Sequence, residues 1–191
     1  MASLSTAGVI DLDEVVQDGV RVRASAGSGS CRRRKTLRKE LKKATRLVAR
    51  LSRESEDDPD ASNRRIEAGR RGAAAAREGR ARAALGKLDE IEAERARRAK
   101  TNRKQVAKQK EPRASTTDAQ ARVMKMADGG YRPAYNRQLA TVAEGQIVVA
   151  AEVVAVGSDR GLARPMIERI ERNHGRRPKR YLVDGGFTKN D

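Results

Sequence analysis

Two aspartates, each followed by glycine, stand in strand-like segments near the two ends of the chain. Asp18 lies in residues 15–22, and Asp184 closes the short segment that begins at Tyr181. An aspartate beside glycine in a buried strand can present its carboxylate to a cleft while the backbone turns sharply away. Two such carboxylates on neighbouring strands would form a site for a hard divalent cation such as Mg²⁺. We therefore expect Asp18 and Asp184 to meet in space.

Three other acids compete as metal ligands. Asp118 follows a Ser-Thr-Thr stretch, and Asp128 precedes two glycines, so both are expected to be turn residues. Glu152 is the one charged residue in the apolar run 147–156 and is expected at a sheet edge or in an ion pair.

The single cysteine and the single histidine have simple interpretations. Cys31 precedes a basic cluster that would lower a thiol pKa, but an incidental reduced cysteine is the simpler explanation. A catalytic triad or a zinc site would depend wholly on His174. It precedes Gly175 at an expected helix end, so we interpret it as a terminal polar residue.

Positive charge is concentrated in the middle of the chain. The 191 residues have a formal net charge of +17 and only 2% aromatic residues. Residues 31–113 contain 28 basic and 13 acidic side chains, whereas residues 1–30 contain two basic and four acidic ones. Such a balance favours a polyanionic partner, most often nucleic acid. No stretch approaches the ~20 apolar residues of a membrane span, so we expect no membrane partner.

The basic block has a helical pattern. Apolar residues recur at helical spacing from Leu37 to Leu51. Residues 57–60 break this run, and the alanine-, arginine- and glutamate-rich stretch from Ser62 to about Lys110 is composed of good helix formers. We predict a charged helical hairpin between the first strand and the rest of the chain.

The last part of the chain has an α/β pattern. Strands are predicted near residues 135–141 and 147–156; the second is so apolar that it suits a central strand buried on both faces. Ser158 or Asp159 is expected to cap a following helix that ends at Gly175, and a last strand leads to Asp184. We therefore predict three segments: residues 1–30 and 114–191, which form one α/β core, and the inserted helical block 31–113.

An ordered series of motifs makes the chain resemble D-D-E type insertion-sequence transposases, which have a ribonuclease H-like catalytic domain. The motifs are residues 16–26, 32–37, 115–118, 121–125, 130–138, 157–159 and 181–187. The resemblance implies a ribonuclease H-like mixed sheet, incomplete here, with the basic helices inserted after its first strand. It also implies that Asp18 and Asp184 are the first two catalytic acids and ligands of a two-Mg²⁺ site.

The chain departs from the family pattern in several places. The third acid of the family is a glutamate well beyond the second aspartate, and only seven residues follow Asp184, none of them glutamate. Only 17 residues precede Asp18, where the family has a DNA-binding region. Val142 stands where an acid is expected, and Arg137 where a small apolar residue is expected. We therefore expect a transposase fragment that binds metal weakly and is inactive alone.

The expected partner is double-stranded DNA, gripped through its phosphates without base reading in a cytoplasmic, nucleoid-associated setting. A second copy or a complementing transposase fragment is left open as a further partner. The cations expected to contact phosphates are Arg32, Arg33, Arg34, Lys35, Arg97, Arg98, Arg103 and Lys104. Two alternatives remain: a non-enzymatic basic helical nucleic-acid binder, and a structural protein whose charged helices pair with an acidic protein.

Overall fold

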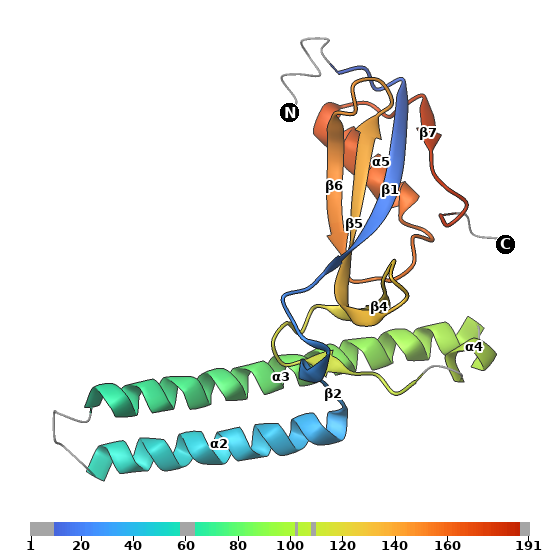
Figure 1. Ribbon diagram of the computed structural model, residues 1–191. Helices are drawn as coiled ribbons and strands as arrows, with labels where there is room; N and C mark the ends of the chain where they lie inside the picture. Colours follow the sequence, from blue (N-terminus) through green and yellow to red (C-terminus); the bar gives the residue numbers. More distant parts are fainter. Residues whose placement is uncertain (1–9, 58–63, 102, 108–109, 188–191) are drawn as a thin grey trace. The chain divides into compact units, whose positions relative to one another are not determined.

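The chain divides into two compact units. The computed structural model describes residues 10–57, 64–101, 103–107 and 110–187. The sheet unit comprises residues 1–24 and 122–191, and the hairpin unit comprises residues 25–121 (Figure 1). The hairpin unit begins at residue 25 and ends at residue 121, whereas the sequence predicted a block from residue 31 to residue 113. The unit therefore includes the segments on both sides of the basic block.

The sheet unit is a mixed five-stranded sheet with one helix. Its elements are β1 (Glu14–Arg23), β4 (Arg122–Lys125), β5 (Tyr131–Val142), β6 (Val148–Val154), α5 (Ala163–His174) and β7 (Arg180–Leu182). The long strand β5 pairs with β1 along one side and with both β4 and β6 along the other. These pairs are antiparallel, and β7 joins the free side of β1 in the parallel sense.

One face of this sheet is covered by α5. Residues of this face, among them Val15, Ala140 and Val149, pack with Met166 and Ile170 of α5 into a core. The core is small because the chain offers no tryptophan and few other rings to fill it. Gly175 ends α5 and has a left-handed φ of 74°. The sequence predicts this helix end.

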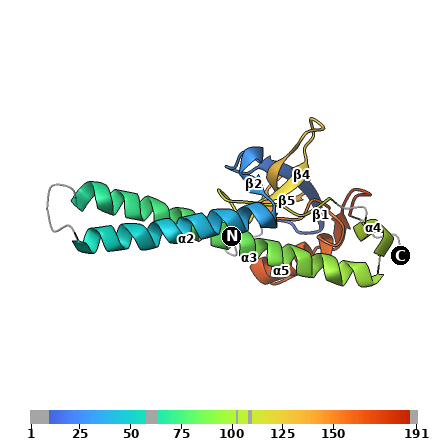
Figure 2. The same cartoon turned by 90° about the horizontal axis from the view of Figure 1, so that it is seen from below.

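The hairpin unit is built from two long helices that run side by side (Figures 1 and 2). Its elements are η1 (Ser28–Ser30), β2 (Cys31–Arg32), α2 (Arg34–Asp57), α3 (Arg64–Thr101), α4 (Arg103–Ala107) and β3 (Ala114–Ser115). Leu37 of α2 meets Leu88 and Ile91 of α3 in a small apolar cluster near β3. Farther along, the buried residues of α3 are alanines. The residues expected to separate the helices lie partly outside the described residues, which resume at Arg64.

The structure corrects several expectations about the strands. β6 is not central: within the described ranges it pairs only with β5, and Val153 is 61% exposed. β5 begins at Tyr131, four residues before the strand predicted near residues 135–141, and β4 was not predicted at all. Both errors have one cause, because the start of a long strand and the existence of a short one depend on the neighbouring strand in space rather than on local composition.

Candidate functional site

Parallel pairing of β1 and β7 brings the two aspartate-bearing segments together. Val15 lies opposite Tyr181, and Val16 lies opposite Leu182. Continuing this register by two residues would set Asp18 opposite Asp184 on strands about 4.8 Å apart. β7 itself ends at Leu182, and Asp184 opens a turn in which the Phe187 amide donates to its carbonyl at 3.2 Å. The two aspartates therefore belong to adjacent segments, Asp18 within β1 and Asp184 just beyond the end of β7.

Both carboxylates are exposed. Oδ1 of Asp18 accepts the Gly19 amide at 2.7 Å, and Oδ1 of Asp184 accepts the Gly186 amide at 2.9 Å. Within the described residues, no hydrogen bond reaches Oδ2 of either side chain. One oxygen of each aspartate is thus oriented by its own backbone, and the other is available to a ligand.

Asp18 lies on the face of the sheet opposite to the α5 side. Side chains alternate along β1, so Asp18 shares its face with Val20 and Val22, each 45% exposed. Val153 of β6 and Leu182 of β7 are in register with this face and are also exposed. The carboxylate therefore stands on an open, largely apolar surface.

A chain of buried polar side chains runs beneath β1 on the other face. Tyr181 donates its hydroxyl to Gln17 at 2.6 Å, and Gln17 donates to Gln138 at 2.6 Å. Gln138 donates to Asn136 at 3.0 Å, and both amides donate to Oδ1 of Asp159 at 2.7 Å. Gln17, Asn136 and Gln138 are each at most 2% exposed. Because every buried amide has a partner, the network fixes the strands of this region in one arrangement.

The network gives a reason for glycine at position 19 that differs from the one expected from the sequence. The sequence suggested a sharp turn after Asp18, but β1 continues to Arg23 and Gly19 has no positive φ. A methyl group at Gly19 would collide with the Gln138 amide and the Asp159 carboxylate. Glycine is required here because polar side chains from two other segments occupy the space above it.

Asp159 is not the helix cap that was expected. The residue before α5 is Leu162, which makes no side-chain cap bond, and the side chain of Asp159 points to the amide network instead. Since Asp159 lies on the Gly19 side, it is on the opposite face from Asp18. Sequence reasoning missed this cluster. The available signal was the spacing of Asn136 and Gln138, which lie two residues apart between Ala134 and Ala140 on the buried face of β5.

Burial raises the pKa of the Tyr181 phenol well above its usual range. The cause is desolvation, because the ring packs against the core while its hydroxyl bonds to Gln17. The phenol therefore stays protonated and acts as a hydrogen-bond donor at the end of the network.

The remaining acids play the structural roles expected of them. Oδ1 of Asp118 accepts the amides of Gln120 and Ala121 at 3.2 and 3.3 Å. Asp128 accepts the Gly130 amide, and this bond, followed by that of Arg132, lowers its pKa. The Glu152 carboxylate forms an ion pair with Arg169 at 3.0 Å. These contacts place all three acids in turns or ion pairs.

Cys31 and His174 are also built into their units. Cys31 is buried, and desolvation raises the pKa of its thiol despite the nearby arginines. Nε2 of His174 lies 3.0 Å from the Val149 carbonyl, to which it donates, at the end of α5. Neither residue has the setting of a nucleophile or a zinc ligand.

The donor set fits a weak site for a hard cation. Asp18 and Asp184 supply carboxylate oxygens, the ligand type that Mg²⁺ prefers. Across the described ranges, no group of three or more His, Cys, Asp or Glu side chains is placed to hold a metal ion. Val142, at the position where the resemblance implies an acid, is buried in the core. Among the residues that the structure describes, this region therefore offers no group of three acids for a metal ion.

The cations expected to contact phosphates fall into two groups. Arg34 donates to Asp89 at 2.7 Å and to Glu92 at 2.9 Å, and these bonds, that of Glu92 first, raise its pKa. Arg32, Arg33 and Arg98 form ion pairs with Glu40, Glu111 and Glu94 at 3.7, 3.2 and 2.5 Å. Four more of the expected cations have no ion-pair partner among the described residues. They are Lys35, Arg97, Arg103 and Lys104. Half of the predicted contact set is therefore partly neutralised.

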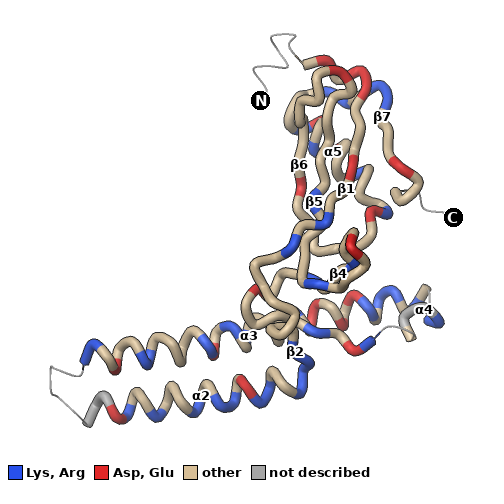
Figure 3. Tube along the Cα trace, in the orientation of Figure 1, with Lys and Arg blue, Asp and Glu red and all other residues tan. Residues whose placement is uncertain are grey.

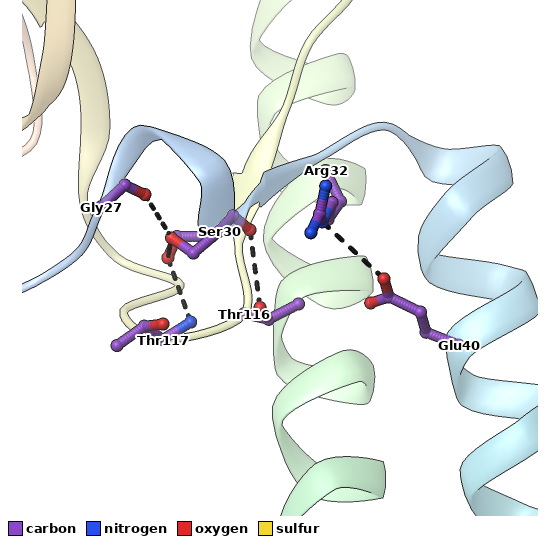
Figure 4. A network of polar contacts seen from close by, with 7 residues as sticks. Gly27, Ser30, Arg32, Glu40, Thr116 and Thr117 are labelled. Atoms are coloured by element: carbon purple, nitrogen blue, oxygen red, sulfur yellow. Dashed lines mark hydrogen bonds and ion pairs between the residues drawn. The ribbon is translucent and has the colours of Figure 1, made fainter.

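Serine and threonine residues form a group of hydrogen bonds at the base of the hairpin unit (Figure 4). The Ser30 hydroxyl donates to the Gly27 carbonyl at 2.7 Å, and the Ser30 carbonyl accepts the amide of Thr116 at 3.1 Å. Ser115 accepts the Thr117 amide at 3.1 Å. The strands β2 and β3 pair beside this cluster. The chain that enters the hairpin is thus tied to the chain that leaves it.

Comparison with known proteins gives no match: no family model, curated protein or solved structure is significantly similar to this chain. Of the helices in the described ranges, none combines the length and apolar character needed to cross a bilayer.

Proposed function

We propose that this chain binds double-stranded DNA through its hairpin unit, and that Asp18 and Asp184 hold Mg²⁺ for phosphoryl transfer of the D-D-E transposase type. The observation that supports the proposal is the parallel register of β1 and β7, which pairs the segment leading to Asp184 with the strand that contains Asp18. A mixed sheet with a long helical insertion after its first strand also agrees with a ribonuclease H-like core.

Charge supports the nucleic-acid part of the proposal. The hairpin unit contains 28 basic and 14 acidic side chains, and the sheet unit 15 and 12. Figure 3 shows Lys and Arg at intervals along both α2 and α3. Cations on extended helices neutralise phosphates and release counterions, so affinity should fall steeply with salt. The hairpin unit has no aromatic residue, so it lacks stacking platforms for single strands.

The two faces of the sheet unit have different roles in this proposal. On the open face, Asp18 presents carboxylate oxygens to solvent, and the exposed carboxylate of Asp184 follows the neighbouring strand β7. On the covered face, the amide network holds β1 in place beneath them. When bound, Mg²⁺ would supply the positive charge that polarises a phosphodiester. With two carboxylates instead of three, we expect weak binding and little or no strand cleavage by this chain.

The test is a Mg²⁺ titration of the purified chain followed by incubation with supercoiled plasmid. We expect weak, saturable Mg²⁺ binding that the Asp18→Asn and Asp184→Asn variants lose, and no nicking. Equal Mg²⁺ binding by wild type and both variants would refute the site. Nicking by wild type that Asp18→Asn abolishes would refute the expected inactivity and would strengthen the assignment of the reaction.

A second candidate is a non-enzymatic nucleic-acid binder in which the sheet unit is scaffold. The concentration of charge in the hairpin unit favours it, because that unit alone would suffice for binding. The two candidates differ in one respect. A pure binder tolerates Asp18→Asn without any change in its response to Mg²⁺.

A further inference from the structure

A groove lies between α2 and α3 on one side of the hairpin. It has a volume of about 360 Å³, and its apolar floor contains Ala44 of α2 with Ala74 and Ala81 of α3. Alanine side chains are too short to fill the space between two helices, so the groove remains open where larger residues would close it. Leu47 completes the apolar part of the lining.

The rim of this groove is cationic. Lys43, Arg77 and Arg80 line it, and none of the three has an ion-pair partner within the described residues. The one acid in the lining is Glu40, which pairs with Arg32 at 3.7 Å. The rim therefore differs from the end of the hairpin near Arg34, where carboxylates engage the guanidinium.

We propose that this groove is the principal contact of the hairpin unit with the phosphodiester backbone of duplex DNA. The inference rests on the proposed function and names the surface that performs it. Three cations from two helices can surround one strand of phosphates, while the alanine floor admits the backbone close to the helices. Thr116 also lines the groove. Contacts to phosphates carry no sequence information, so binding through this groove is independent of sequence.

The main experiment compares two triple variants of the full chain. The groove variant is Lys43→Gln, Arg77→Gln, Arg80→Gln. The control is Lys42→Gln, Arg46→Gln, Arg53→Gln, which removes the same residue types from one exposed face of α2 outside the groove. All six side chains are exposed, so both variants should fold, which far-UV circular dichroism verifies.

The readout is the affinity for a fluorescent duplex across a series of salt concentrations. Each lost phosphate contact lowers the slope of log affinity against log salt by about 0.9, so the groove variant should lose about 2.7. The control should lose clearly less. Equal losses in the two variants would overturn the groove while leaving DNA binding intact. A wild-type chain that shows no salt-dependent duplex binding would overturn the proposed function and the groove together.

Lysine acetylation of the wild-type chain gives a second test that needs no variant. Lys42 and Lys43 are neighbours in sequence, both are exposed, and only Lys43 lines the groove. Duplex DNA should protect Lys43 several-fold more than Lys42, as measured by mass spectrometry. Equal protection would contradict the proposal. Stronger protection of Lys43 by polyglutamate than by DNA would assign the groove to an acidic polypeptide and also contradict it.

Discussion

The two units of this molecule use polar residues in opposite ways. The hairpin unit keeps its charges outside, and much of its interior is alanine. The sheet unit buries three amide side chains beneath the strand that carries Asp18 and gives each of them a partner. Exposed charges tolerate rearrangement, whereas a buried polar network permits one arrangement. The comparison indicates that the region near Asp18 depends on one fixed arrangement of side chains, whereas the hairpin depends on where its exposed charges lie along the helices.

Glycine gives the sharpest contrast between the units, and the largest effect is expected at Gly19. The Gly19→Ala change forces Gln138 and Asp159 from their places and leaves buried polar groups unpaired. We expect a loss of about 3 kcal/mol in the free energy of unfolding of the sheet unit. Tyrosine fluorescence in urea measures it, because all three tyrosines belong to that unit.

The matched control for this change is Gly157→Ala, where the added methyl would meet Met124 only at ordinary contact distance. A Gly19→Ala variant as stable as this control would show that the network yields readily.

In the hairpin unit the same substitution should have the opposite sign. Gly79 lies inside α3, and a methyl group there meets nothing within 4 Å. Gly79→Ala should stabilise α3 by about 1 kcal/mol because alanine has the higher helix propensity. Thermal unfolding followed at 222 nm measures the change. No change, or destabilisation, would mean that Gly79 serves a purpose other than flexibility.

The network should also make the sheet unit sensitive to high pH. The pKa of Tyr181 is raised in the folded state, so its contribution to stability is complete below the unfolded value of about 10 and is lost as the pH rises above it. The stability difference between wild type and Tyr181→Phe should therefore be constant from pH 8 to 9.5 and shrink toward pH 11.5. A difference that stays constant to pH 11.5 would contradict the burial argument.

The smallest effect is expected at the exposed ion pairs of the hairpin. Arg34→Gln removes contacts to Asp89 and Glu92 and should cost about 1 kcal/mol at low salt, less as salt rises. Arg50→Gln breaks only the pair with Glu54 and should cost a few tenths of that. Urea unfolding at two salt concentrations distinguishes them. Equal costs would show that the connection between α2 and α3 adds nothing.

Local patterns in the sequence were sufficient for the helices. The spacing of Leu37 to Leu51 predicted α2, and the apolar positions around Met166 predicted α5. The strand that contains Asp18 and the turn after Asp184 were also anticipated. In each case the information lies within a few residues.

What sequence reasoning missed depends on partners that are distant in the chain. β6 has the composition of a central strand, yet it lies at an edge because only β5 pairs with it among the described residues. Asp159 has the position of a helix cap, yet Asn136 and Gln138 bind its carboxylate. The groove could not be predicted either, since it arises from alanines on two helices that must first be paired.

The account depends on a cation shared by two carboxylates, and manganese relaxation of amide signals tests this most directly. Mn²⁺, added in place of Mg²⁺, should broaden the amide signals of Gly19 and Gly185 with a single midpoint. Either Asp18→Asn or Asp184→Asn should abolish both effects, while Asp128→Asn should change neither. If each variant removed only the broadening beside its own position, the two aspartates would act separately and the shared site would be refuted.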